Sequence, residues 1–238
     1  MGRTRLILLT LCLFAVVGVA AQGEPDFDKR MREYGLVDIR SLDNEILVEL
    51  KYATEDNFVG ENMYGSLRTA YLLPHFAQKV LKAQQLLKQR KPDHTLLVYD
   101  AARPISVQRR MRRVVEGTDL EAYVADASRG GRHNYGVAVD LTIADGEGQP
   151  LDMGAGFDFF GEAAWVGQSN TTTLEGYKAY VEGLVKRGVI TRKAAGNRIL
   201  LLEIMCQAGM RPYVKEWWHY QETISMTRTR ELYKLLDF

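Results

Sequence analysis

The sequence predicts an α+β domain in which helices flank a small, largely antiparallel sheet. Three observations favour this class. Strand-like and helical segments are mixed along the 238 residues without the regular strand–helix alternation of a parallel α/β fold. The strand-like segments are short, and no internal repeat is present. The hydrophobic content of 46% suits one core of ordinary size, so a single domain is expected.

Four segments have the pattern of strands. Residues 46–54 alternate apolar and polar side chains, and a loop rich in Gly and Asn follows at 56–72. Residues 95–100 and 136–143 are apolar runs typical of buried strands, and the aromatic segment 216–221 is also strand-like. On the second apolar run, a strand would place its valines on one face and Asp140 on the other.

Four segments have helical spacing of apolar residues: 74–91, 105–117, 173–188 and 194–209. The first begins with a proline at a position that a helix tolerates, and the last closes at a glycine. Residues 22–36 are polar, and we expect them to form a loose lead-in to the domain.

The N-terminus has the layout of a secretory signal peptide over residues 1–21. Arg3 and Arg5 precede an apolar run at 6–20 that ends in small side chains. This run is short for a spanning helix, which needs about 20 residues, although an uncleaved anchor is the alternative. We therefore expect an exported protein, periplasmic or secreted, whose mature domain is 22–238.

Charge and cysteine content exclude several classes of partner. The formal net charge is +1, and removal of the signal arginines leaves 29 basic against 30 acidic residues, or −1. No basic block stands out, so neither nucleic acid nor, after signal cleavage, a membrane is expected as a partner. Cys206 would be the only cysteine of the mature chain and cannot form an internal disulfide. The sequence gives no indication of the oligomeric state.

One carboxylate is out of place. Asp140 lies among valines, seven residues after His133, and only three other histidines exist in the chain, His219 among them. A divalent cation would offset the cost of burying this carboxylate. Two imidazoles and one carboxylate leave a fourth position open, as in a catalytic zinc site. The pattern thus predicts one Zn²⁺ per chain in a cleft.

Spacing alone also allows a structure without a metal. His133 could cap a turn, Asp140 could pair with Arg132, and His219 could be a packed ring beside two tryptophans. No short metal signature such as H-E-x-x-H is present.

Two further residues favour chemistry at this place. Arg103 follows the apolar run 95–100 and stands just before a proline, where it could stabilise an oxyanion in a cleft. Glu216 could act as a general base on zinc-activated water. A regular strand, however, would send Glu216 and His219 to opposite faces. Either Glu216 lies on the preceding loop, or the strand bends.

Five stretches together resemble the D-alanyl-D-alanine dipeptidases, the VanX-like zinc peptidases. They occur in family order and are KYATEDNFVGENMYG, YDAARP, RHNYGVAVDLTI, MGAGFDFF and EWWHY. The resemblance implies a zinc dipeptidase that hydrolyses D-Ala-D-Ala, with ligands and catalytic groups at His133, Asp140, His219, Glu216 (base) and Arg103 (stabiliser of the tetrahedral intermediate).

The resemblance also implies two substrate-binding residues. Asp158 would hold the free ammonium of a dipeptide, and Tyr52 would help to shape the site. This chain departs from the pattern just before His133, where it has GGR and relatives often have serines. The backbone N–H groups of Gly130 and Gly131, or the side chain of Arg132, could replace the missing contacts to the substrate carboxylate.

Two other functions fit the same residues. One is a D,D- or L,D-carboxypeptidase that trims peptidoglycan stem peptides with the same zinc site. The other is a non-catalytic zinc-containing module that binds peptides, although such a module needs neither Glu216 nor Arg103.

Overall fold

A five-stranded sheet runs through the molecule, whose computed structural model describes residues 26–124 and 127–238. Its strand order is β2-β4-β5-β7-β6, and neighbouring strands are antiparallel except β2 with β4. The strands are Leu47–Val48 (β2), Thr95–Asp100 (β4), Ala138–Ala144 (β5), Arg211–Tyr213 (β6) and Glu216–Gln221 (β7). Val37–Asp38 (β1) and Tyr71–Leu72 (β3) form a separate antiparallel pair. The predicted α+β class is confirmed.

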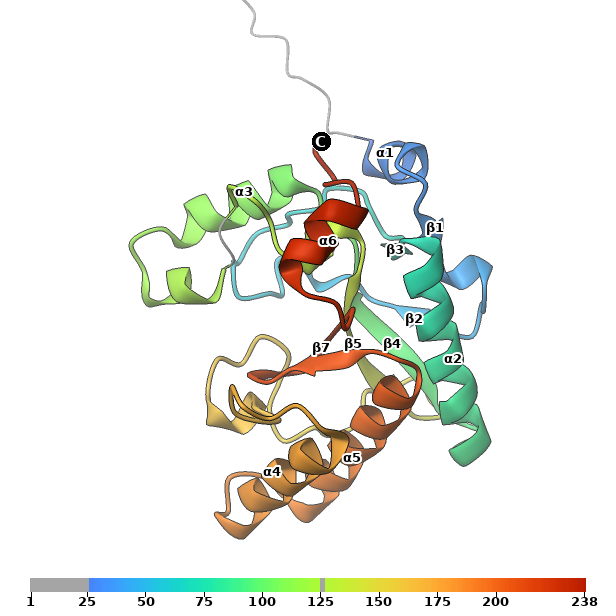
Figure 1. Cartoon of the computed structure of the whole chain (residues 1–238), viewed down its shortest axis with the longest axis vertical. Helices are drawn as coiled ribbons and strands as arrows, with labels where there is room; N and C mark the ends of the chain where they lie inside the picture. The colour runs from blue at the N-terminus through green and yellow to red at the C-terminus, as the bar shows by residue number, and fades with distance from the viewer. Residues whose placement is uncertain (1–25, 125–126) are drawn as a thin grey trace, which may run out of the picture.

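Six α-helices surround the sheet in the described part of the chain. They are Phe27–Glu33 (α1), Pro74–Arg90 (α2), Ile105–Val115 (α3), Leu174–Lys186 (α4), Arg192–Gln207 (α5) and Met226–Leu232 (α6). Helices α2 and α5 contact each other and the central strands, and α4 packs on α5. Helices α3 and α6 lie toward the end of the molecule that carries the C-terminus (Figure 1).

The N-terminal segment departs from the prediction of a loose lead-in. Helix α1 forms there because the side chain of Asp26 accepts a hydrogen bond from the backbone N–H of Lys29, and because Phe27 and Met31 are buried on one face. The predicted signal peptide (1–21) lies outside the described residues. Within the ranges that the structure describes, no helix has both the length and the apolarity needed to cross a bilayer.

The predicted strand at 46–54 is largely wrong. Only β2 pairs with the sheet, and the chain then turns through a 3₁₀ helix, Lys51–Ala53. The turn is stabilised because the carbonyl oxygen of Tyr52 accepts hydrogen bonds from the backbone N–H groups of Met63 (2.7 Å) and Tyr64 (3.1 Å). The Tyr52 side chain is buried at this turn.

The remaining predicted strands and helices are confirmed with small shifts of their ends. Strand β5 is buried at every position, so it lies at the centre of the domain. A 3₁₀ helix, Arg132–Tyr135, precedes it and ends at Gly136, whose φ is +66°. A Cβ at Gly136 would lie 3.1 Å from the Leu36 side chain and 3.3 Å from the backbone nitrogen of Leu73, so glycine allows this close approach.

Candidate metal centre

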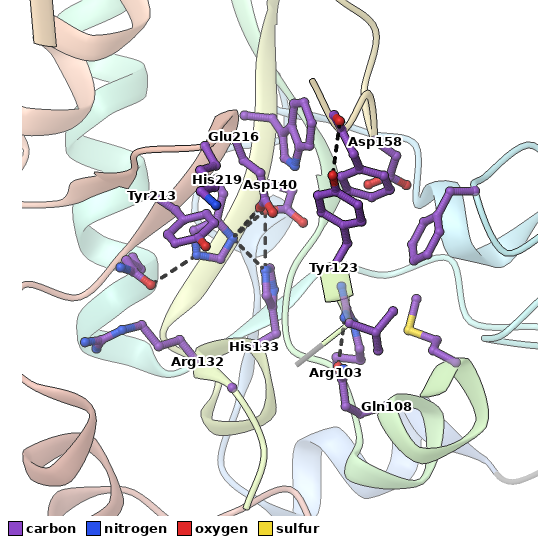
Figure 2. A pocket seen from close by; sticks show the side chains of 18 of the residues that line it. Arg103, Gln108, Tyr123, Arg132, His133, Asp140, Asp158, Tyr213, Glu216 and His219 are labelled. Carbon is purple, nitrogen blue, oxygen red and sulfur yellow. Dashed lines mark hydrogen bonds and ion pairs between the residues drawn. The ribbon is translucent and has the colours of Figure 1, made fainter. Parts of the chain in front are cut away.

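Three side chains from two adjacent strands and one turn converge at the middle of the sheet (Figure 2). Asp140 of β5 and His219 of β7 are direct partners in the antiparallel register. His133 comes from the 3₁₀ turn that leads into β5. His219 Nδ1 lies 2.9 Å from Asp140 Oδ1, and His133 Nε2 lies 3.4 Å from the same oxygen and 3.1 Å from His219 Nδ1. These residues form a possible metal-binding triad.

The outer nitrogens of both imidazoles have acceptors. His133 Nδ1 donates to the carbonyl oxygen of Ala101 at 2.7 Å, and His219 Nε2 donates to Gln221 Oε1 at 3.2 Å. Because each outer nitrogen carries the proton, the inner nitrogens, His133 Nε2 and His219 Nδ1, present lone pairs toward Asp140. Two lone pairs and a carboxylate oxygen repel one another unless a positive charge lies among them.

The donor set fits a metal ion. Atoms that are about 2.0–2.2 Å from one tetrahedral centre lie roughly 3.4 Å apart, close to the separations of these three donors. Burial opposes the positive charge of His133, yet the neighbouring Asp140 outweighs it and raises the pKa of His133. Burial likewise opposes the charge of Asp140, but the two imidazoles more than offset this and lower its pKa. The cluster therefore stabilises a positive charge at its centre.

Glu216 faces the same site because strand β7 is irregular. Pro212 of β6 pairs with Tyr220, whereas the next residue, Tyr213, pairs with Glu216. The extra residues of β7 break the two-residue alternation, so Glu216 and His219 both line one cavity. Of the two arrangements that the sequence allowed, the structure has the irregular strand, since Glu216 is the first residue of β7. Glu216 Oε2 stays 3.9 Å from His219 Nδ1, and burial raises the pKa of Glu216 to about 7.

Arg103 enters the cavity from the end of β4. Its guanidinium donates from Nε (3.1 Å) and Nη2 (2.5 Å) to Asp100 Oδ2, and from Nη1 to Gln108 Oε1 at 2.9 Å. Asp100 is fully buried and also accepts a hydrogen bond from the Tyr64 hydroxyl at 2.6 Å. Burial opposes the charge on Arg103, but Asp100, Tyr64, Tyr52 and Asp140 together outweigh it and raise the pKa of Arg103. This cation is fixed in place and charged at any working pH.

Asp158 lies on the loop after β5 and faces the cavity (Figure 2), which Tyr52 also lines. The Tyr52 hydroxyl donates to its two carboxylate oxygens, at 3.1 and 2.9 Å. No basic side chain of residues 26–124 or 127–238 forms an ion pair with Asp158. Burial, reinforced by Asp140 and Glu216, raises the pKa of Asp158 well above its usual value despite the Tyr52 hydrogen bond. A cationic group of a ligand would supply the missing charge.

A cavity of about 490 Å³ is lined by all seven residues that the sequence pointed to. They are Tyr52, Arg103, His133, Asp140, Asp158, Glu216 and His219. The three donors and Glu216 occupy its middle, and Asp158 lies toward one end (Figure 2). Arg132 lies on the opposite side of the triad from Asp158 (Figure 2), and Gln221 also lines the cavity.

Two of the metal-free interpretations can be compared with the structure. The predicted pair of Arg132 with Asp140 is wrong, and the packing of His219 beside the tryptophans describes only part of its surroundings. Arg132 does not pair with Asp140; its guanidinium donates to Thr229 Oγ1 (3.0 Å) and to the carbonyl oxygen of Ile224 (2.6 Å). His219 does lie near the tryptophans, but its ring nitrogens face Asp140 Oδ1 at 2.9 Å and Gln221 Oε1 at 3.2 Å. The N–H of Gly131 donates to Asn134 Oδ1 at 2.8 Å, so it is engaged within the turn.

Two supporting residues escaped the sequence reasoning. Gln221 stands two residues after His219, and the strand period of two would have placed it on the same face. Gln108 fixes Arg103 from helix α3, five residues along the chain, and no local pattern marks that contact.

A family model described as D-ala-D-ala dipeptidase, Peptidase M15, matches residues 32–175 of this chain. The chain belongs to the peptidase M15 family. It is similar to the D-alanyl-D-alanine dipeptidase of Escherichia coli (strain K12), with 31% identity over 186 residues, 78% of this chain and 83% of that protein. It is also 26% identical to the D-alanyl-D-alanine dipeptidase of Enterococcus faecium over 208 residues, 79% of this chain and 91% of the relative.

The M15 match ends before β7, the strand that carries Glu216 and His219. These two residues join the site through the pairing of β7 with β5. Membership of the M15 family makes this protein a metallopeptidase of the dipeptidase type, in agreement with the resemblance that its motifs carry.

Proposed function

We propose that this protein is a zinc-dependent dipeptidase that hydrolyses D-Ala-D-Ala to free D-alanine. The names of the relatives support the substrate. The observation that carries the proposal is a cavity that joins the His133–Asp140–His219 donor set to a half-buried carboxylate, Asp158, which has no ion-pair partner among the described residues.

Zinc is the proposed metal because the donors are two imidazole nitrogens and one carboxylate oxygen. Three protein ligands leave a fourth position for water or substrate, which is the pattern of catalytic zinc. When bound, the ion supplies positive charge that polarises the scissile carbonyl and acidifies water. His133, Asp140 and His219 would hold it.

Glu216 is the proposed general base. Its carboxylate is close to the donor set without joining it, at 3.9 Å from His219 Nδ1, and it makes no other ion pair among the described residues. It takes a proton from the attacking water and returns it to the leaving amine. The water oxygen bonds to the carbonyl carbon first, and the peptide C–N bond then breaks as the leaving nitrogen takes the proton, so that two amino acids are released.

Arg103 is the proposed stabiliser of the negative charge that develops on the carbonyl oxygen. A guanidinium has five N–H groups, and Asp100 and Gln108 engage three of them. The remaining groups can donate to the substrate, and because the side chain is held on two sides it needs little reorganisation to do so.

Asp158, with Tyr52, is the proposed site for the substrate's free ammonium. The amino nitrogen of a dipeptide is charged at neutral pH, whereas the same nitrogen in a longer or acylated peptide is a neutral amide. Only the dipeptide gives Asp158 a charge-assisted hydrogen bond. This contact favours a dipeptidase over a D,D- or L,D-carboxypeptidase that acts on stem peptides.

Metal analysis combined with three substrates tests the proposal. The purified protein is expected to hold one zinc per chain and to cleave D-Ala-D-Ala, but not N-acetyl-D-Ala-D-Ala or a stem pentapeptide. A preference for N-acetyl-D-Ala-D-Ala or for the stem pentapeptide would establish the carboxypeptidase function instead. Zinc content without cleavage of any of them would indicate the binding module.

We further propose that the protein is exported, periplasmic or secreted, on the strength of the signal-like residues 1–21. N-terminal sequencing of the protein from its native cell is expected to find a chain that begins near Gln22. An intact Met1 on cytosolic protein would overturn this proposal.

A further inference from the structure

Arg198 of helix α5 is a buried cation that binds only backbone carbonyl groups. Its side chain is 1% exposed, and it forms no ion pair with a carboxylate in the described ranges. The guanidinium donates from Nε to the carbonyl oxygen of Met153, from Nη2 to that of Ala163 at 2.5 Å, and from Nη1 to that of Trp165 at 3.2 Å. Burial lowers the pKa of Arg198 to about 10, which leaves it charged at neutral pH.

These three carbonyl groups belong to the two ends of one loop. Met153 begins the loop 153–165, Ala163 and Trp165 end it, and Asp158 lies between them. The loop contains no strand, and apart from one 3₁₀ turn near its end it has few backbone hydrogen bonds of its own. Arg198 therefore ties the two ends of the loop to each other and to helix α5.

Asp158 needs such support because its backbone is strained. Its φ is +58°, the only positive value at a non-glycine residue in the described chain. A non-glycine residue rarely adopts this conformation and keeps it only where the surrounding structure enforces it. Its side chain is half-buried and has the Tyr52 hydroxyl as its hydrogen-bond partner. Neither the backbone nor the side chain of Asp158 would hold this position unaided.

We infer that Arg198 is a positioning residue for substrate recognition: by joining the ends of the loop 153–165 it holds Asp158 where the carboxylate meets the substrate's ammonium. This inference rests on the proposed function. Arg198 itself does not line the cavity, so it acts through Asp158. A planar guanidinium suits this role because its fixed fork can donate to three carbonyl groups in different directions, which the compact ammonium of lysine cannot reproduce.

The test is Arg198→Lys, with Arg192→Lys as the matched control. Arg192 is the first residue of the same helix. Its side chain is exposed and pairs with Glu182, which is not part of the loop. The ammonium contact of Asp158 exists in both the bound substrate and the transition state, so its loss changes KM and spares kcat. We expect KM for D-Ala-D-Ala to rise about tenfold in Arg198→Lys, the scale of a supporting residue behind a binding group, with zinc content retained. Arg192→Lys is expected to leave both constants unchanged.

A double variant separates positioning from general damage. In an Asp158→Asn background, Arg198→Lys is expected to add less than about a twofold change, because residues that act through one group are not additive. An equal tenfold rise in KM in that background, or a fall in kcat with loss of zinc, would overturn the inference.

If Arg198→Lys does not fold, Asn197→Ala provides a second variant. It removes the hydrogen bond to the carbonyl oxygen of Asp152 (2.8 Å) from the helix surface, and a smaller rise in KM is expected. No rise in KM in that variant would count against the inference.

Amide hydrogen exchange tests the inference without measuring the reaction. Arg198→Lys is expected to accelerate exchange at residues 155–161 and to leave strands β4 and β5 unchanged. Unchanged exchange in the loop overturns the role of Arg198 even in a protein that cleaves D-Ala-D-Ala. Failure of the wild type to cleave D-Ala-D-Ala refutes the proposed function instead.

Discussion

Replacement of Glu216 by glutamine separates the chemistry of this site from its metal binding. Glutamine has nearly the same shape as glutamate but cannot accept a proton at neutral pH. Because Glu216 Oε2 lies 3.9 Å from His219 Nδ1, whereas Asp140 Oδ1 lies 2.9 Å from it, the donor set does not depend on Glu216. The variant should therefore retain its zinc.

The expected loss of activity follows from the role of a general base. Such a group contributes about 10²- to 10⁴-fold to the rate, or roughly 2.7 to 5.4 kcal/mol of transition-state stabilisation. Turnover of D-Ala-D-Ala by Glu216→Gln should fall by about 10²-fold or more at full zinc occupancy. Glu203→Gln is the matched control, because Glu203 forms exposed ion pairs on helix α5, and such pairs contribute little.

Stability should change in the opposite direction to activity. Folding raises the pKa of Glu216 from 4.5 to about 7, because the carboxylate is buried. The metal-free folded protein thus retains a proton that the unfolded chain releases, so stability falls as pH rises from about 4.5 to about 7. Glutamine carries no charge to bury. Metal-free Glu216→Gln should unfold at a temperature no lower than metal-free wild type at pH 7, and the difference should vanish near pH 4.

Colorimetric release of D-alanine, zinc analysis by mass spectrometry and thermal unfolding measure these three quantities on one preparation. If Glu216→Gln loses zinc in proportion to activity, Glu216 is a ligand and the assignment of the base is wrong. If the variant keeps both zinc and full turnover, the proton is moved by another group.

Three further predictions concern other parts of the molecule. His133→Ala and His219→Ala should each lose zinc and activity together, and metal analysis that finds full occupancy in both would refute the three-ligand site. Asp158→Asn should lower kcat/KM for D-Ala-D-Ala by roughly 10- to 5 × 10³-fold, on the basis of about 1.5–5 kcal/mol for a charged hydrogen bond, with zinc retained; a loss of zinc in parallel with activity would make Asp158 structural. Burial raises the pKa of the Cys206 thiol to about 11, so alkylation at pH 8 should be slow in the folded protein and fast in denaturant, and rapid labelling of the native state would contradict this burial.

The sequence by itself predicted the class of fold and seven of the residues that line the cavity. Local spacing is sufficient for the long helices and for β4, β5 and β7, because an apolar face with the right period is a property of neighbouring residues. The position of the Asp140 carboxylate among valines was enough to predict a metal site before the fold was considered. Asp158 and Tyr52, by contrast, came from resemblance to a family, since nothing in their local sequence distinguishes them.

Only the tertiary structure decided how these residues act together. The antiparallel register of β5 with β7 puts Asp140 opposite His219, and the irregular pairing of β7 with β6 turns Glu216 to the same cavity. Strand pairing joins segments about 80 residues apart, so no local pattern contains it. The three carbonyl groups that hold Arg198 are backbone atoms, present at every residue, and their convergence on one guanidinium depends only on how the loop 153–165 folds against α5.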